Sequence, residues 1–186
     1  MERFNTDKIE NGLMCEYYSL LGALKYKKIS LLEIGIGYGD SLKFWSNYFQ
    51  HPESKIIGID IRIPKVDFPE NVTVYQCDQN NRSMLREIAE LHGKFDVVID
   101  DGSHRKKETE TCFYTLMDYL AEGGFYVIED WAVGYWKDKP QYLGMVELIT
   151  DIIENAPQLT IEEMRITLAP SKAISFFRKG RSGWTH

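Results

Sequence analysis

The chain has 186 residues, of which 44% are hydrophobic, and its 28 acidic and 22 basic residues give a net charge of −6. These values fit one globular domain with an apolar core. They disfavour nucleic acid as a partner, because nucleic-acid binding usually needs a basic surface. No apolar run approaches the roughly 20 residues of a membrane span, and the polar amino terminus lacks a signal-peptide core. We therefore expect a cytoplasmic protein without membrane contact.

Apolar runs alternate with helical patterns along the chain. We expect helices at 9–26, 40–49, 81–92, 105–121 and 141–155, and strands at 29–36, 55–61, 72–77, 95–101, 124–130, 160–168 and 173–178. Continuous apolar runs are typical of parallel strands that are buried on both faces. The pattern predicts a single α/β domain over 1–186 with a mostly parallel sheet and a late hairpin. Within it, we expect 1–27 to form a helical cap and 180–186 to be a mobile tail.

A glycine-rich turn joins the first expected strand to its helix. Its glycines, Gly35, Gly37 and Gly39, allow tight turning and a close approach of the backbone to a ligand. Asp60 ends the second strand, where a carboxylate can accept hydrogen bonds from ribose hydroxyls. Dinucleotide-binding proteins share this combination, so it leaves the cofactor open.

An acid inside the first strand, Glu33, helps to narrow the choice. A carboxylate there suits a cationic or amine-bearing ligand beside the glycine turn and would repel a pyrophosphate. Asp78 and Gln79, at the end of the third strand, offer an acceptor and an amide to an adenine edge. Structural interpretations also stay open: Glu33 could pair with Lys55 or Arg62, and Asp78 could cap the following helix.

Two of the expected strands end in adjacent carboxylates. Asp100 and Asp101 follow one of them, and Glu129 and Asp130 follow the other. The carboxyl ends of neighbouring parallel strands meet where open α/β sheets bind ligands. Four carboxylates repel one another there unless a cation or hydrogen-bond donors lie among them, and a hard divalent metal is the simplest solution. The alternative is that these residues cap helices on a solvated edge.

These motifs resemble a known family. The segments Glu33-Ile-Gly-Ile-Gly37 and Cys77-Asp-Gln-Asn80, with Asp60, resemble class I S-adenosylmethionine-dependent methyltransferases. Val98-Ile-Asp-Asp-Gly-Ser-His104 and Val127-Ile-Glu-Asp-Trp131 resemble the metal-dependent sugar O-methyltransferases of macrolide biosynthesis (mycinamicin and macrocin types), which are grouped with cephalosporin hydroxylase-like proteins. The similarity extends from about residue 5 to about residue 137 and includes Thr6-Asp7-Lys8 and the Tyr17-Tyr18 pair.

The resemblance implies a Rossmann-like class I methyltransferase fold with a seven-stranded sheet, helices on both faces and a C-terminal antiparallel hairpin strand. It implies an O-methyltransferase that uses S-adenosylmethionine and Mg²⁺ (or Mn²⁺). The implied cofactor contacts are Glu33, Gly35, Gly37, Ser41, Asp60, Ile61, Asp78, Gln79 and Asp100. The implied metal ligands are Asp101, Glu129 and Asp130, and the implied catalytic residues are Asp101 and His104, the latter as general base.

The expected partner is a small molecule with a hydroxyl acceptor, such as a sugar or a glycosylated natural product, and a homo-oligomer is compatible with the sequence. Trp131 and Trp136 could line the acceptor site or pack in the core. Larger members of the family carry an auxiliary amino-terminal domain for which this sequence has no room, so the acceptor stays open. The alternatives are an NAD-dependent oxidoreductase and an inactive nucleotide-binding or scaffold protein.

Overall fold

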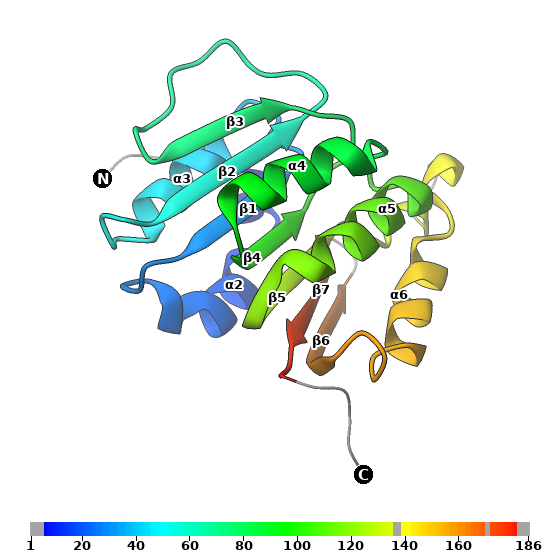
Figure 1. Cartoon of the computed structure of the whole chain (residues 1–186). Helices are drawn as coiled ribbons and strands as arrows, with labels where there is room; N and C mark the ends of the chain where they lie inside the picture. Colours follow the sequence, from blue (N-terminus) through cyan, green and yellow to red (C-terminus); the bar gives the residue numbers. More distant parts are fainter. Residues whose placement is uncertain (1–5, 136–138, 170–171, 182–186) are drawn as a thin grey trace.

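The computed structural model describes residues 6–135, 139–169 and 172–181. Its strands form one seven-stranded sheet in the order β3-β2-β1-β4-β5-β7-β6 (Figure 1). The strands are β1 (Ser30–Ile34), β2 (Lys55–Asp60), β3 (Val72–Gln76), β4 (Phe95–Asp100), β5 (Leu120–Glu129), β6 (Ile161–Ala169) and β7 (Lys172–Lys179). The first five are mutually parallel, whereas β7 is antiparallel to both β5 and β6. The predicted parallel sheet with a late hairpin is confirmed.

Helices connect the strands at the expected places. They are α1 (Asp7–Glu10), α2 (Met14–Leu21), α3 (Asp40–Tyr48), α4 (Arg82–His92), α5 (Lys106–Leu116) and α6 (Met145–Glu154), with 3-10 turns η1 (Gly22–Leu24), η2 (Met117–Tyr119), η3 (Val133–Tyr135) and η4 (Pro140–Tyr142). One expectation was wrong: the first helix is not continuous over 9–26. Gly12 adopts a left-handed backbone with φ of 70°, and this conformation separates α1 from α2.

The sheet is covered on both faces, as predicted. Leu85 of α4, Phe113 of α5 and Ile152 of α6 belong to the apolar cluster on one face. Tyr17 of α2 and Trp45 of α3 belong to the cluster on the other face. Figure 1 shows α4 and α5 side by side across the first of these faces. No helix in the described part of the chain is long and apolar enough to cross a membrane.

The order of the strands creates a ligand-binding edge between β1 and β4. From β1 the chain moves outward to β2 and β3 and then returns to β4 on the other side of β1. At such a switch point, the loops after the two central strands separate and leave a crevice. The backbone N–H of Asp101 donates to the carbonyl of Ile34 at 2.9 Å, so the loops after β1 and β4 begin side by side.

Two further expectations fall on residues outside the described ranges. They concern Trp136 as an acceptor wall and most of the tail, 182–186. Trp131 lies within the described ranges and is 5% exposed, in the core cluster beneath α4, α5 and α6. Of the two roles considered for Trp131, the structure therefore shows core packing.

Candidate functional site

A cavity of about 720 Å³ opens at the carboxyl ends of the central strands. It is lined by the loops after β1, β2, β3 and β4 and by Thr6 from the amino-terminal segment. Nine of the residues singled out from the sequence line it: Gly35, Gly37, Ser41, Asp60, Ile61, Asp78, Gln79, Asp101 and His104. Glu33, Asp100, Glu129 and Asp130 are not among the lining residues. The geometry of these four explains why.

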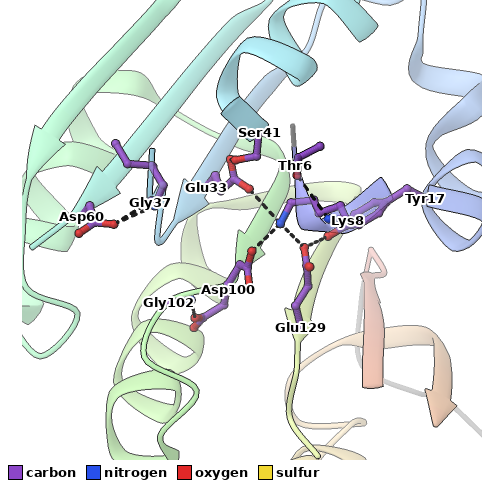
Figure 2. Close-up of polar contacts among 12 residues, drawn as sticks. Thr6, Lys8, Tyr17, Glu33, Gly37, Ser41, Asp60, Asp100, Gly102 and Glu129 are labelled. Carbon is purple, nitrogen blue, oxygen red and sulfur yellow. Dashed lines mark hydrogen bonds and ion pairs between the residues drawn. The ribbon is translucent and has the colours of Figure 1, made fainter. Parts of the chain in front are cut away.

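The glycine turn after β1 is shaped by close backbone contact and by Asp60. Gly35 has φ of 84°, and a Cβ there would collide with the backbone carbonyl oxygen of Asp101. Gly37 has φ of 50°, and a Cβ there would meet nothing within 4 Å. Asp60 Oδ2 accepts from the backbone N–H groups of Ile36 at 2.9 Å and Gly37 at 3.3 Å (Figure 2). Asp60 therefore holds the turn as well as facing the cavity.

Behind this turn lies Glu33, which is completely buried. Its Oε2 accepts a hydrogen bond from the Ser41 hydroxyl at 2.6 Å, and its Oε1 lies 3.3 Å from Lys8 Nζ. Burial raises the pKa of Glu33, an effect that Lys8 opposes. Its ion pair is thus with Lys8, and not with Lys55 or Arg62. Ser41 stands between the Glu33 carboxylate and the cavity.

The loop after β3 is joined to the loop after β4 through Gln79. The Gln79 amide nitrogen donates to Asp100 Oδ1 at 3.1 Å, and its oxygen accepts from the Ser103 backbone N–H at 2.8 Å. Burial raises the pKa of Asp100 to about 7, against the hydrogen bonds that it accepts. Asp78 is not the cap of α4: the side chain of Asn81 accepts from the first turn of that helix. Asp78 Oδ1 instead accepts a hydrogen bond from the backbone N–H of Asn80 at 2.8 Å, and Asp78 lines the cavity.

The acidic edge contains a cation that the sequence did not reveal. The Lys8 side chain is completely buried, and Nζ lies 2.6 Å from Asp101 Oδ2 and 2.8 Å from Glu129 Oε1, in addition to Glu33. Tyr17 donates its hydroxyl to the same oxygen of Glu129. Figure 2 shows Lys8 reaching into this group from the amino-terminal segment. The carboxylates therefore share an internal counter-cation.

The contacts between Lys8 and the carboxylates, together with burial, shift the pKa values of Lys8 and Glu129. Burial alone would lower the pKa of Lys8, but the three carboxylates outweigh it and hold the pKa well above its ordinary value. Burial raises the pKa of Glu129, and Asp101 adds to this shift, whereas Lys8 and the Tyr17 hydroxyl oppose it. The ammonium thus stays charged throughout the physiological pH range.

A second group, formed by Asp101, His104 and Asp130, could hold a metal ion. Each offers one ligand atom, and these atoms lie within 4.8 Å of one another. His104 Nε2 is 3.9 Å from Asp101 Oδ1, whereas Lys8 Nζ contacts the other oxygen of this carboxylate, Oδ2. His104 and Asp130 have φ of 54° and 52°, and they are two of the three non-glycine residues with positive φ in the described part of the chain. Left-handed backbone is uncommon outside glycine and gathers at functional sites.

This group differs in one member from the set that the resemblance implies. It includes two of the three implied ligands, Asp101 and Asp130, together with His104. Glu129 is set back from it, 2% exposed, with one oxygen engaged by Lys8 and Tyr17. The residues that sequence reasoning missed are therefore Lys8 and Tyr17 as members of the acidic edge. Four neighbouring carboxylates signal that a cation is needed, but nothing in the spacing points to residue 8.

Comparison with known proteins gives a consistent result. The methyltransferase domain family model matches residues 32–131. Among curated proteins, a tetracenomycin 3'-O-methyltransferase that acts on a 2-methoxy-α-L-rhamnosyl derivative (Streptomyces olivaceus) is 42% identical over 60% of this chain and 30% of its own length. Demethylmacrocin O-methyltransferase (Streptomyces fradiae) is 34% identical over 69% of this chain and 36% of its own length.

Among solved structures, the MycE methyltransferase of the mycinamycin pathway, in complex with Mg, SAH and mycinamycin VI, matches with a TM-score of 0.76 and 30% identity. The match covers 90% of this chain and 49% of MycE. This chain therefore spans about a third of the length of the curated relatives and about half of the solved one. The family model matches more than half of the chain, over the segment that builds the cavity. On this evidence, the chain belongs to the methyltransferase domain family and has the class I methyltransferase fold.

Proposed function

We propose that this chain is an O-methyltransferase domain that uses S-adenosylmethionine and a divalent metal to methylate a hydroxyl of a sugar or another polyhydroxylated small molecule. The observation that carries the proposal is a juxtaposition. Asp101 and His104 line the cavity beside the glycine turn, and both belong to the group that could hold a metal. A cofactor cavity and a metal group thus meet at one wall.

The charge of the cavity favours a sulfonium cofactor over a dinucleotide. Among the described residues, its lining contains five carboxylates, from Asp40, Asp60, Asp78, Asp101 and Glu108, and one guanidinium, from Arg105. A pyrophosphate would be repelled by such a lining, whereas a sulfonium and an amine would be attracted. The volume of about 720 Å³ lies within the range of roughly 300–1,000 Å³ that is usual for small-molecule sites. S-adenosylmethionine supplies an electrophilic methyl group when it is bound there.

The donors of the metal group suit a hard or borderline divalent cation. Two carboxylates with one imidazole, and no thiolate, favour Mg²⁺ or Mn²⁺. Asp101 and Asp130 would hold the ion, with Glu129 as the third ligand, so that His104 stays available as the base. Such a cation lowers the pKa of a hydroxyl and orients it.

The residues of this chain supply the remaining chemistry. His104 Nε2 would accept the proton of the acceptor hydroxyl as its oxygen takes the methyl group, whose bond to the cofactor sulfur would break with the electron pair staying on sulfur. Asp101, whose Oδ1 lies 3.9 Å from that nitrogen, would orient the imidazole and stabilise its charged form. The acidic cavity would also attract the cationic cofactor and release its neutral product.

The proteins to which this chain is similar support the class of acceptor. Two relatives are named as O-methyltransferases of a rhamnosyl tetracenomycin and of an olivosyl oleandolide, and MycE was solved with mycinamycin VI. The chain covers only a fraction of their length, so the particular acceptor is not carried over.

The test is transfer of a labelled methyl group from S-adenosylmethionine to a panel of rhamnosyl glycosides, olivosyl glycosides and mycinamicin VI, with Mg²⁺ or with EDTA. We expect transfer to a sugar hydroxyl in Mg²⁺ and its loss in EDTA, restored by adding metal. Full transfer in EDTA would remove the metal from the proposal. If only hydroxyls outside the sugars are methylated, the proposal that the acceptor is a sugar is wrong.

A further inference from the structure

The ammonium group of Lys8 lies at the meeting point of three elements of the sheet. Glu33 comes from β1, Asp101 from the loop after β4 and Glu129 from the end of β5, and each contributes an oxygen within 3.3 Å of Nζ. The lysine itself belongs to α1, far from all three in sequence. Lys8 and Glu33 are completely buried and Glu129 is 2% exposed, whereas Asp101 is 15% exposed and reaches the cavity.

Two of the three carboxylates that contact Lys8 direct their other oxygen to a second group. Glu33 Oε2 accepts from Ser41, which lines the cofactor cavity. Asp101 Oδ1 faces His104 in the candidate metal group. Lys8 therefore contacts one carboxylate that supports the cavity and one that belongs to the metal group. It is the link between the two.

We propose that Lys8 is a positioning residue that makes cofactor binding independent of the metal, an inference that rests on the proposed function. Its charge holds Glu33, Asp101 and Glu129 together, so the cavity wall is already formed before a metal arrives. Ionised carboxylates buried together without a cation repel one another. If the ammonium is removed, a divalent cation becomes the charge that can restore the wall.

The experiment measures the affinity for S-adenosylhomocysteine (SAH) by calorimetry, in EDTA and in saturating Mn²⁺, for wild type and for Lys8→Met. Methionine keeps most of the length and apolar volume of the lysine stem but has no charge. We expect wild-type affinity to change less than about threefold between the two conditions. For Lys8→Met, we expect at least a tenfold loss in EDTA and recovery of most of that loss in Mn²⁺. By linkage, SAH should then strengthen Mn²⁺ binding to the variant by the same factor.

Lys172→Met is the matched control. Lys172 Nζ contacts Glu16 at 2.9 Å and the carbonyl of Gly12 at 3.5 Å, so it ties the same amino-terminal segment to β7 without touching the acidic edge. Its SAH affinity should follow the wild type in both conditions. If Lys8→Met keeps wild-type affinity in EDTA, or loses affinity equally with and without metal, the proposed role of Lys8 is disproved. If wild type binds no SAH in either condition, the proposed function fails instead.

A double variant keeps the test decisive if Lys8→Met does not fold in EDTA. Lys8→Met with Glu129→Gln loses one carboxylate together with the ammonium, so less repulsion remains. Circular dichroism should show it folded in EDTA, with SAH affinity within about tenfold of wild type. Failure of this variant to fold or to bind would show that the shape of the lysine matters and not its charge, which contradicts the proposal.

Discussion

His104 and Asp130 combine two features at the scale of the single residue: a left-handed backbone and a place in the candidate metal group. A histidine or aspartate tolerates this conformation better than most residues do, but it still costs free energy. The cost is offset by the direction that it gives the side chains, toward Asp101. Substitutions of His104 or Asp130 should therefore introduce residues that tolerate a left-handed backbone, so that the variants report on chemistry and not on strain.

We expect His104→Asn to lower the single-turnover rate of methyl transfer by about 10²- to 10⁴-fold, the usual effect of losing a general base. Asparagine tolerates a left-handed backbone and cannot take up the proton. SAH and Mn²⁺ affinities should stay within about threefold of wild type. A large loss of Mn²⁺ affinity would instead identify His104 as a metal ligand.

At the scale of the element, the glycine turn between β1 and α3 decides how closely the loops after β1 and β4 can approach each other. Gly35 needs both its positive φ and the absence of a Cβ, because the Asp101 carbonyl occupies that space. Gly37 needs only the positive φ. Comparing substitutions at Gly35 and Gly37 therefore separates the cost of close packing from the cost of backbone strain.

Gly35→Ala should lower the free energy of unfolding by about 2–5 kcal/mol, since about 1–2 kcal/mol of left-handed strain adds to about 1–3 kcal/mol of overpacking. Gly37→Ala should lose only the first of these, about 1–2 kcal/mol. Urea denaturation of both variants measures the difference. Equal losses would mean that the close approach of the two loops does not constrain residue 35.

Most elements could be predicted because buried parallel strands leave apolar runs, and helices between them leave a 3.6-residue pattern. The first helix could not: Gly12 interrupts a periodicity that continues on both sides of it. The start of β5 at Leu120 was also missed, because its pairing with Phe95 precedes the apolar run. The acids that follow strand ends lie at the carboxyl edge of the sheet, as their sequence positions predict, whereas Lys8 could not be placed because only tertiary packing brings α1 beneath the acidic edge.

The same limit explains which predicted site residues face the cavity. Sequence position indicates the strand end from which a side chain comes, but not whether neighbouring side chains cover it. Glu33 and Asp100 lie at the expected edge, yet Ser41 and Gln79 stand in front of them. Whether these two acids contact a cofactor stays a prediction.

At the scale of the whole molecule, the structural match covers 90% of this chain and 49% of MycE. The loops after β1, β2, β3 and β4, which line the cavity, belong to this chain. We therefore expect this chain by itself to bind the methyl-donor cofactor, whatever the acceptor is.

Calorimetry with SAH, with and without Mg²⁺ and with NAD as the comparator, tests this claim most directly. We expect SAH to bind with one-to-one stoichiometry and NAD not to bind. Asp60→Ala should weaken SAH binding by about 1–3 kcal/mol, because it removes a charged hydrogen-bond acceptor that also holds the glycine turn. Tight binding of NAD without binding of SAH would contradict the account and would favour an oxidoreductase.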